Sequence, residues 1–213
     1  MIGIAIGREL PPTKYARFED VGNTDLPKTA DDMVCFDMTK DPQKGHSALR
    51  RGRASVVGAT YFLTLGIADR KTSLLEGGCL GGIFAELGRL EGDGAIARLR
   101  CAVVMQDHTH LLFQLGDRIN LGQIVSRLKA KTKYALERNE LRWQGGYHDH
   151  RIDVDEELFP VFAYLFRNPV RAGLVDDPKQ HPGWMICRGD AEWFYPEVEL
   201  TNRDEAERPS WMT

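Results

Sequence analysis

The chain has 213 residues, of which 42% are hydrophobic and 28% charged, so it can bury one core with an appendage but not two large domains. It has no run of about 18 apolar residues and no basic-then-apolar secretory signal at its N-terminus, which predicts a cytoplasmic protein that neither spans a membrane nor is exported. The formal net charge of -3 argues against a nucleic-acid partner only until the charges are located along the chain.

Basic side chains are concentrated in the middle of the chain. Residues 1–41 carry five basic and eight acidic side chains and residues 190–213 carry two and seven, so the remaining residues have a net charge of +5. Between Arg118 and Lys133 five cations occur without a carboxylate, as expected of a surface that neutralises phosphates. A charge run of this kind is also typical of a solvated helix face.

One catalytic domain is the economical interpretation of this length, and because the apolar pattern sharpens from Arg50, we place that domain at 49–188. Residues 1–48 mix proline, glycine and acidic pairs with short apolar stretches, which indicates an irregular or accessory N-terminal extension, and residues 189–213 are predicted to be an acidic C-terminal tail. The domain opens with a strand at 56–67, directly after the basic cluster Arg50, Arg51 and Arg53.

The remaining predicted elements define the fold class. They are a helix at 74–90, strands at 99–105 and 111–115, an amphipathic basic helix at 119–138, a strand at 147–152, and a helix capped by Asp153 or Asp155 that ends near Asn168–Pro169. This order predicts an α+β fold in which helices pack on a single antiparallel-rich sheet, a split βαβ arrangement.

Two pairs of histidines could bind metal. His108 and His110 lie beside an apolar strand, where alternation puts residues two apart on the same face, and imidazole is a common ligand of divalent transition metals. His148 and His150 form a second pair, so a zinc site with four histidines is an alternative. Asp149 could orient a neighbouring histidine, and both pairs could also be polar strand residues without chemistry.

Tyr164 is a candidate nucleophile. Asn168 follows it by one helical turn, so a phenol and an oxygen ligand could reach one site together. Because a phenol has a pKa of about 10, it becomes a useful nucleophile only where a cation or base stabilises the phenolate. Arg167 and Arg171 near the end of this helix could contact phosphates, although helix C-termini also favour arginine for electrostatic reasons.

Three segments carry a family resemblance: VVMQDHTHLLFQL, WQGGYHDHRI and FAYLFRNPVRAGLV. In order and spacing they resemble the REP-associated tyrosine transposases, relatives of the insertion-sequence transposases of the HUH single-tyrosine class. The resemblance runs from about Arg50 to about Trp184. It departs from the family at the middle of the HUH motif, where Thr109 replaces a bulky apolar residue.

The resemblance implies a ferredoxin-like sheet of the HUH endonuclease type and a specific site. By the family's pattern, His108 and His110 bind Mg²⁺ or Mn²⁺, Tyr164 of the Y-x-x-x-N-P motif is the nucleophile and Asn168 is a further metal ligand. His150 matches a histidine that recurs in the family. The implied activity is nicking and rejoining of single-stranded or hairpin DNA at repeated palindromes through a 5′-phosphotyrosine, by a nucleoid-associated bacterial protein that is a monomer or a homodimer.

DNA contacts are expected from basic and aromatic side chains that lie outside the catalytic set. They are Arg50, Arg51, Arg53, Arg127, Lys131, Tyr134, Arg138, Trp143, Arg167 and Arg171. Two other functions remain open at this point. One is a non-catalytic module that binds DNA hairpins, and the other is a zinc hydrolase that uses both histidine pairs.

Overall fold

The computed structural model describes residues 15–16, 55–68, 72–153 and 156–201, together with Pro209 and Trp211. Within these ranges the elements follow the apolar periodicity of the sequence, with a two-residue repeat in strands and a three-to-four-residue repeat in helices. In chain order they are β1 (Tyr15–Ala16), β2 (Thr60–Gly66), α2 (Cys79–Gly92), β3 (Ile96–Val104), β4 (His108–Leu115), α3 (Leu121–Glu137), β5 (His148–Ile152), α4 (Leu158–Arg171), the 3₁₀ helix η2 (Pro178–Gln180), β6 (Trp184–Cys187) and α5 (Arg188–Leu200).

The strands form one sheet in the order β1-β6-β3-β4-β2-β5, and every neighbouring pair is antiparallel. Helix α2 connects β2 to β3 across β4, and α3 connects β4 to β5 across β2. Each connection therefore skips one antiparallel strand, which is the split βαβ arrangement of a ferredoxin-like sheet. The predicted α+β, ferredoxin-like fold class is confirmed.

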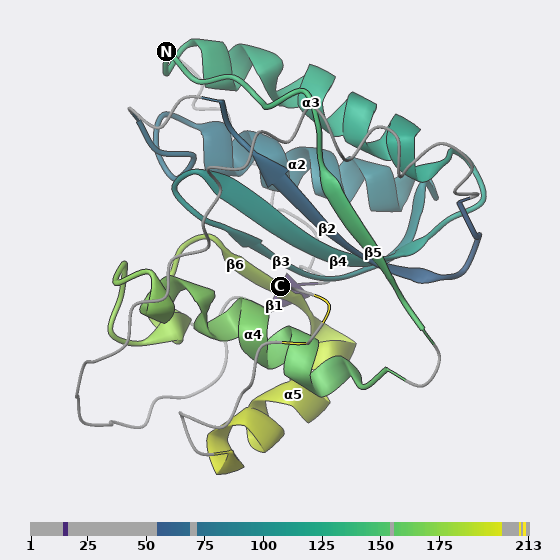
Figure 1. Ribbon diagram of the computed structural model, residues 1–213, viewed down its shortest axis with the longest axis vertical. Coiled ribbons are helices and arrows are strands. Elements are labelled where there is room, and N and C mark those ends of the chain that lie inside the picture. Colours follow the sequence, from purple (N-terminus) through teal and green to yellow (C-terminus); the bar gives the residue numbers. More distant parts are fainter. Residues whose placement is uncertain are drawn as a thin grey trace, which may run out of the picture.

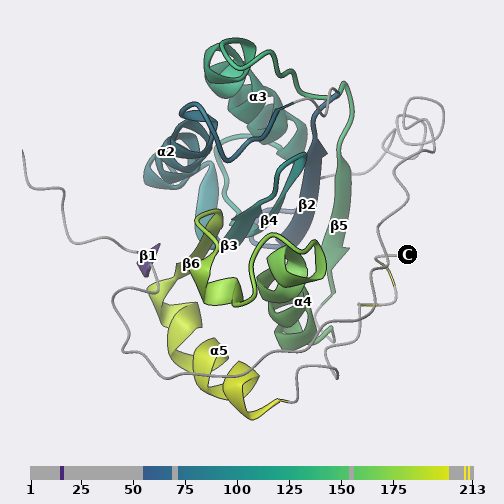
Figure 2. The same cartoon turned by 90° about the vertical axis from the view of Figure 1, so that its left-hand side faces the viewer.

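Helices cover both faces of the sheet, as Figures 1 and 2 show. Because successive side chains of a strand point to opposite faces, Leu63 and Phe113 join the core under α2 and α3. Phe62 and Leu112 join a second core, under α4 and α5. On β4 the even-numbered residues therefore face α4, and the odd-numbered residues face away from it.

The two helices of the first face begin for different local reasons. Helix α3 matches the predicted helix at 119–138, because Asn120 and Gln123 form a reciprocal capping box at its start. Helix α2 begins at Cys79, later than the predicted residue 74. Gly77 has a φ of +59°, and a Cβ there would collide with the side chain of Asn139, so the chain turns at this point before the helix can start.

The predicted end of α4 at Asn168–Pro169 is wrong, because the helix continues to Arg171 with Pro169 inside it. Because proline lacks an N–H, the helix loses one backbone hydrogen bond at Pro169. The Pro169 ring is nevertheless buried, and the helix is capped only a few residues later. Gly173 adopts a φ of +66°, and Leu174 N–H donates to the Pro169 carbonyl, which forms a Schellman cap. The predicted aspartate cap is also wrong, since the N-cap residue is Glu157 and makes no side-chain cap hydrogen bond.

Part of the predicted acidic tail is an ordered helix. The buried side of α5 carries Ala191, Phe194, Tyr195 and Val198 against the core that also contains α4. These residues have helical spacing, but Pro196 and the many carboxylates nearby favoured a tail over a helix in the sequence. The domain boundaries themselves remain a prediction, and most of the N-terminal extension lies outside the described residues. None of the described helices is both long and apolar enough to cross a membrane.

Candidate active site

His108 and His110 lie on the same face of β4, as alternation requires. Their ring centroids are 4.6 Å apart and their Nε2 atoms are 3.1 Å apart. His110 is buried, with 7% of its surface exposed, and packs against the ring of Phe62 at a centroid distance of 5.1 Å. The two Nε2 atoms therefore converge on one point under α4.

The other nitrogen of each imidazole is held by a neighbouring side chain. Asp107 Oδ1 lies 2.7 Å from His108 Nδ1, and Thr64 Oγ1 lies 2.8 Å from His110 Nδ1. A carboxylate only accepts hydrogen bonds, so His108 Nδ1–H donates to it, and the Thr64 hydroxyl can accept from His110 Nδ1–H in the same way. Both Nε2 atoms then present lone pairs to each other.

This arrangement fits a divalent cation. A cation that binds two imidazole nitrogens at about 2.0–2.1 Å on adjacent coordination positions separates them by roughly 3 Å. Metal-bound histidines usually donate their other N–H to a carboxylate or another oxygen, and each of these two histidines has such an oxygen within hydrogen-bond distance of Nδ1. Within the described ranges, however, no group of three or more His, Cys, Asp or Glu side chains could hold a metal ion. Among the described residues, further ligands would therefore come from an amide side chain, with water or substrate oxygens completing the set.

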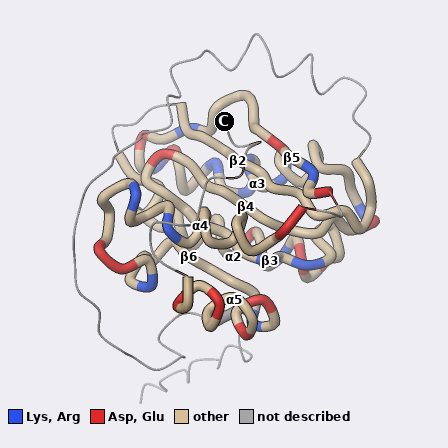
Figure 3. The backbone as a smooth tube through the Cα atoms, turned by 60° about the horizontal axis from the view of Figure 1, so that its bottom comes forward, with Lys and Arg blue, Asp and Glu red and all other residues tan. Residues whose placement is uncertain are grey.

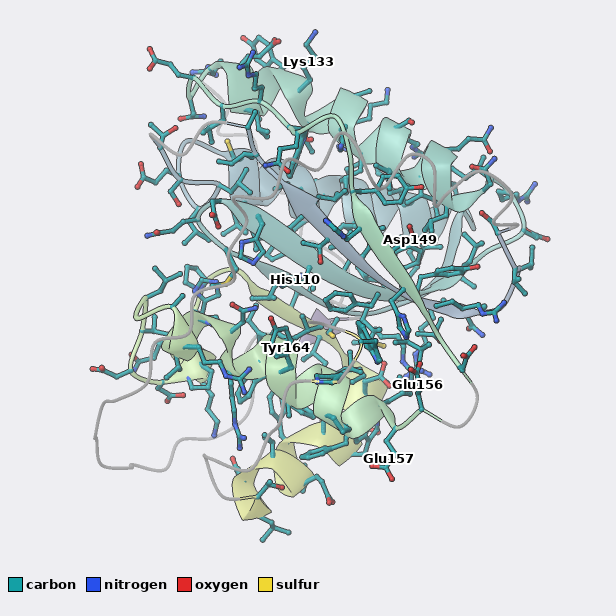
Figure 4. All side chains as sticks on the ribbon, viewed as in Figure 1. His110, Lys133, Asp149, Glu156, Glu157 and Tyr164 are labelled. Carbon is teal, nitrogen blue, oxygen red and sulfur yellow. The ribbon has the colours of Figure 1, made fainter. Side chains whose placement is uncertain are left out.

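Tyr164 of α4 faces this pair of histidines. Its ring centroid lies 6.2 Å from that of His110, and Figure 4 shows the two residues on opposite sides of the space between α4 and the sheet. Arg171, two turns later, places its Cζ 5.1 Å from the centre of the Tyr164 ring. Asn168, one turn after Tyr164, is half-buried on the same stripe of the helix. A phenol, an amide and a cation thus lie along one helix face.

The second histidine pair shares this face of the sheet but does not join the first. Thr64 pairs with both His110 and His148, so β2 separates the two histidine strands. Two strand spacings put the backbones of β4 and β5 roughly 10 Å apart. Among the described residues, no three His, Cys, Asp or Glu side chains are placed to hold one ion. The four-histidine zinc centre considered from the sequence is therefore wrong.

His150 has a partner that the sequence did not indicate. Its Nε2 lies 3.1 Å from each carboxylate oxygen of Glu156, which follows β5 by only a few residues. Asp149 pairs with Leu63 and so points to the opposite face of the sheet from His150. The signal in the sequence was a carboxylate a few residues after the strand that carries the histidine.

Comparisons with known proteins bear on the fold. No family model matches the chain, and no curated protein matches it. A solved structure of a REP-associated tyrosine transposase bound to a REP hairpin is 20% identical, has a TM-score of 0.60, and is aligned over 74% of this chain and 93% of its own. This chain has the fold of a REP-associated tyrosine transposase. The resemblance seen in the sequence is thereby confirmed at the level of the fold.

A second solved structure also matches, that of a proposed transposase from Deinococcus radiodurans R1. It is 18% identical and is aligned over 48% of this chain and 85% of its own, but its TM-score of 0.38 is too low to bear on the fold.

The departure at Thr109 is compatible with the REP-associated tyrosine transposase fold. Thr109 is fully buried on the face of β4 that points away from Tyr164, and its hydroxyl donates to the Val103 carbonyl at 3.1 Å. The polar atom is therefore satisfied, and the histidines on either side keep their positions.

Several predicted DNA contacts have structural partners. Arg127 donates to Glu86 and Asp93, and this pairing raises the pKa of Arg127. Trp143 donates through Nε1 to Thr132 at 2.9 Å and packs against the core of α2 and α3. Both side chains are therefore engaged within the protein, in contrast to Lys131 on the outer side of α3.

The remaining predicted contacts occur on two sides of the sheet. Tyr134 is 72% exposed and has Arg138 over its ring, on the face of the sheet opposite to Tyr164. Arg167 and Arg171 lie on α4, and Arg167 donates to the Thr201 carbonyl. Figure 3 shows basic positions both along α3 and beside α4, with acidic positions interspersed. Arg50, Arg51 and Arg53 lie outside the described residues.

Proposed function

We propose that the protein is a metal-dependent single-stranded DNA transesterase, a transposase or nuclease that nicks and rejoins DNA at hairpin-forming repeats through a 5′-phosphotyrosine. The main support is the distance of 6.2 Å between the ring centroids of Tyr164 and His110. His110 Nε2 in turn lies 3.1 Å from His108 Nε2. The Tyr164 ring from α4 and the two facing Nε2 atoms from β4 therefore lie close together.

His108, His110 and the side-chain oxygen of Asn168 would hold Mg²⁺ or Mn²⁺. When bound, the ion would polarise the scissile phosphate and neutralise the charge that develops on it. A site with few protein ligands suits this chemistry, because Mg²⁺ commonly keeps coordination positions for water and substrate phosphates. Asp107 and Thr64 hold the two imidazoles with their Nε2 lone pairs toward the ion.

Tyr164 acts as the nucleophile. Its phenol oxygen forms a bond to the phosphorus while the bond from phosphorus to the 3′ oxygen of the preceding nucleotide breaks, and the phenol proton is balanced by the proton on the released 3′-hydroxyl. The guanidinium of Arg171 lies over the Tyr164 ring, with its Cζ 5.1 Å from the ring centre, where it can contact a phosphate held at the site. Because one phosphodiester replaces another, attack by a later 3′-hydroxyl rejoins strands without ATP.

The substrate class rests on two kinds of support. The transposase of similar fold is bound to a REP hairpin, and Lys131, Tyr134 and Arg138 present charge and an aromatic ring to solvent on α3. Tyr164 lies beside the histidines of its own chain, so the proposed site can form within a single copy. A bacterial protein of this activity would act on DNA in the cytoplasm, in association with the nucleoid.

The test is formation of a covalent protein–DNA adduct. A hairpin oligonucleotide with single-stranded flanks, incubated with Mn²⁺ or Mg²⁺, should give a shifted band in a denaturing gel, and a chelator should prevent it. Tyr164→Phe should abolish the adduct. Tyr61→Phe is the matched control, because that hydroxyl lies on the other face of the sheet, where it accepts from Val56 N–H. An adduct that persists in Tyr164→Phe would exclude Tyr164 as the nucleophile.

A second candidate function is a DNA-hairpin-binding module without catalysis. The observation that favours it is that, among described residues, the site offers fewer than three His, Cys, Asp or Glu ligands. Hairpin binding that survives His108→Ala and His110→Ala, with no adduct from the wild type under any divalent ion, would support this function over the first.

A further inference from the structure

Trp211, close to the C-terminus, stacks on the face of the sheet that carries the candidate active site. Its ring is parallel to that of His150, with an interplanar angle of 10° and centroids 3.9 Å apart. It also meets Phe62 edge-on at 5.2 Å. Trp211 thus contacts His150 and Phe62 ring to ring, and another flat ring can make the same contacts.

The imidazole under Trp211 is held in a fixed plane. His150 Nε2 meets both oxygens of Glu156, and Glu156 Oε2 also accepts from the backbone N–H of Asp153 at 2.7 Å. The carboxylate is therefore tied to the end of β5, and the imidazole cannot rotate without losing these bonds. A rigid, partly exposed aromatic ring is a surface on which a base can stack. Such stacking tolerates any base, because every base has a flat aromatic face.

This face is next to the histidines that would hold the metal. Phe62 lies between His110 and Trp211. Its ring centroid is 5.1 Å from that of His110 and 5.2 Å from that of Trp211. His150 pairs with Phe62 across β5 and β2, so both side chains point toward the same side of the sheet as His110. A ring at the position of Trp211 is therefore within about one or two nucleotides of a phosphate at His110.

We propose that the face formed by His150 and Phe62 is a stacking site for a nucleobase of the DNA strand, and that Trp211 occupies it when DNA is absent. This inference rests on the proposed function, since it assumes a single strand that passes His110. Indole is a flat bicyclic ring of about the size of a purine, so a purine base can take the position of the Trp211 ring. The base that stacks there belongs to a nucleotide within about one or two positions of the cleaved phosphate.

The test is equilibrium binding of single-stranded oligonucleotides, measured by fluorescence anisotropy in Tyr164→Phe so that no adduct forms. An oligonucleotide scanned with an abasic site should lose roughly 5- to 150-fold in affinity at one position near the cleavage point, the range typical of base–aromatic stacking. His150→Ala should remove this positional loss, and His150→Phe, which keeps a flat ring, should retain it. Trp211→Ala should tighten binding of the intact oligonucleotide, whereas Trp193→Ala, a change at another partly exposed tryptophan, should not.

Each outcome separates this inference from the proposed function. An abasic scan that is flat, or one whose profile His150→Ala leaves unchanged, overturns the stacking site, while the adduct formed with Tyr164 intact still tests the nuclease. Weaker binding by Trp211→Ala would also overturn the inference, because the indole would then be a wall of the DNA site. Positional loss that depends on His150, without any adduct, would retain the stacking site and reject catalysis.

Discussion

Replacing Arg127 by methionine tests whether this cation stabilises the fold or binds DNA. Arg127 belongs to the basic run that the sequence offered as a phosphate-binding surface, but its Nε donates to Glu86 Oε1 at 2.8 Å. The Glu86 side chain is only 1% exposed and lies in α2, so this contact ties α2 to α3. Arg127 also pairs with Asp93, and the hydrogen bond from Arg127 lowers the pKa of that carboxyl group.

The expected cost follows from the partners left behind. Glu86 is buried whereas Arg127 is 31% exposed, and removing the partner of a buried charge costs about 3–5 kcal/mol when that charge is left uncompensated. Glu86 keeps a second contact, from Arg89 Nη1 to Oε2 at 3.0 Å, which places Arg127→Met at the lower end of that range. About 3 kcal/mol should lower the Tm by roughly 6–12 °C in a chain of this size.

The assay combines thermal unfolding with DNA binding, and Lys131→Met is the matched control. Lys131 lies one turn further along α3 and is exposed, so its loss should change stability by less than about 0.5 kcal/mol. If it contacts a phosphate, DNA binding should weaken and the slope of log K against log salt should decrease by about 1. Glu86→Gln added to Arg127→Met should recover much of the lost Tm, since it removes the stranded charge. A wild-type Tm for Arg127→Met, together with DNA binding weakened as in Lys131→Met, would contradict a structural role for Arg127.

Two further predictions concern histidines. Asp107→Asn should raise the Mn²⁺ concentration needed for half-maximal adduct formation by about 10- to 100-fold, because His108 loses the carboxylate that fixes its tautomer; an unchanged Mn²⁺ titration would contradict that role. Burial lowers the pKa of His181, so the unfolded chain binds a proton more readily than the folded one as pH falls below about 6.5. Its contribution to stability is thus present above that pH and is lost toward pH 5, and urea unfolding at pH 7.5 and 5.0 should show a smaller decrease for His181→Gln than for the wild type.

Much of the fold was predictable because local periodicity dominates it. The strand and helix patterns from residue 56 to residue 167 indicated the correct elements in the correct order, and four strands linked by two crossover helices admit few arrangements. The errors lie where a local rule was overridden. Pro169 was expected to end α4, but its burial and the cap at Gly173 allow the helix to pass through it.

The sequence by itself determined that His108 and His110 share one face of a strand and that Asn168 follows Tyr164 by one turn, because these relations depend only on the repeat of a single strand or helix. It could not determine that α4 packs on the even-numbered side of β4 and brings Tyr164 within 6.2 Å of His110, or that β2 separates His148 from the first pair. Those relations join elements far apart in the chain, and their geometry follows from strand order and helix packing. The same distinction explains why Arg127 looked like a phosphate ligand in the sequence, since its partner Glu86 lies on another helix.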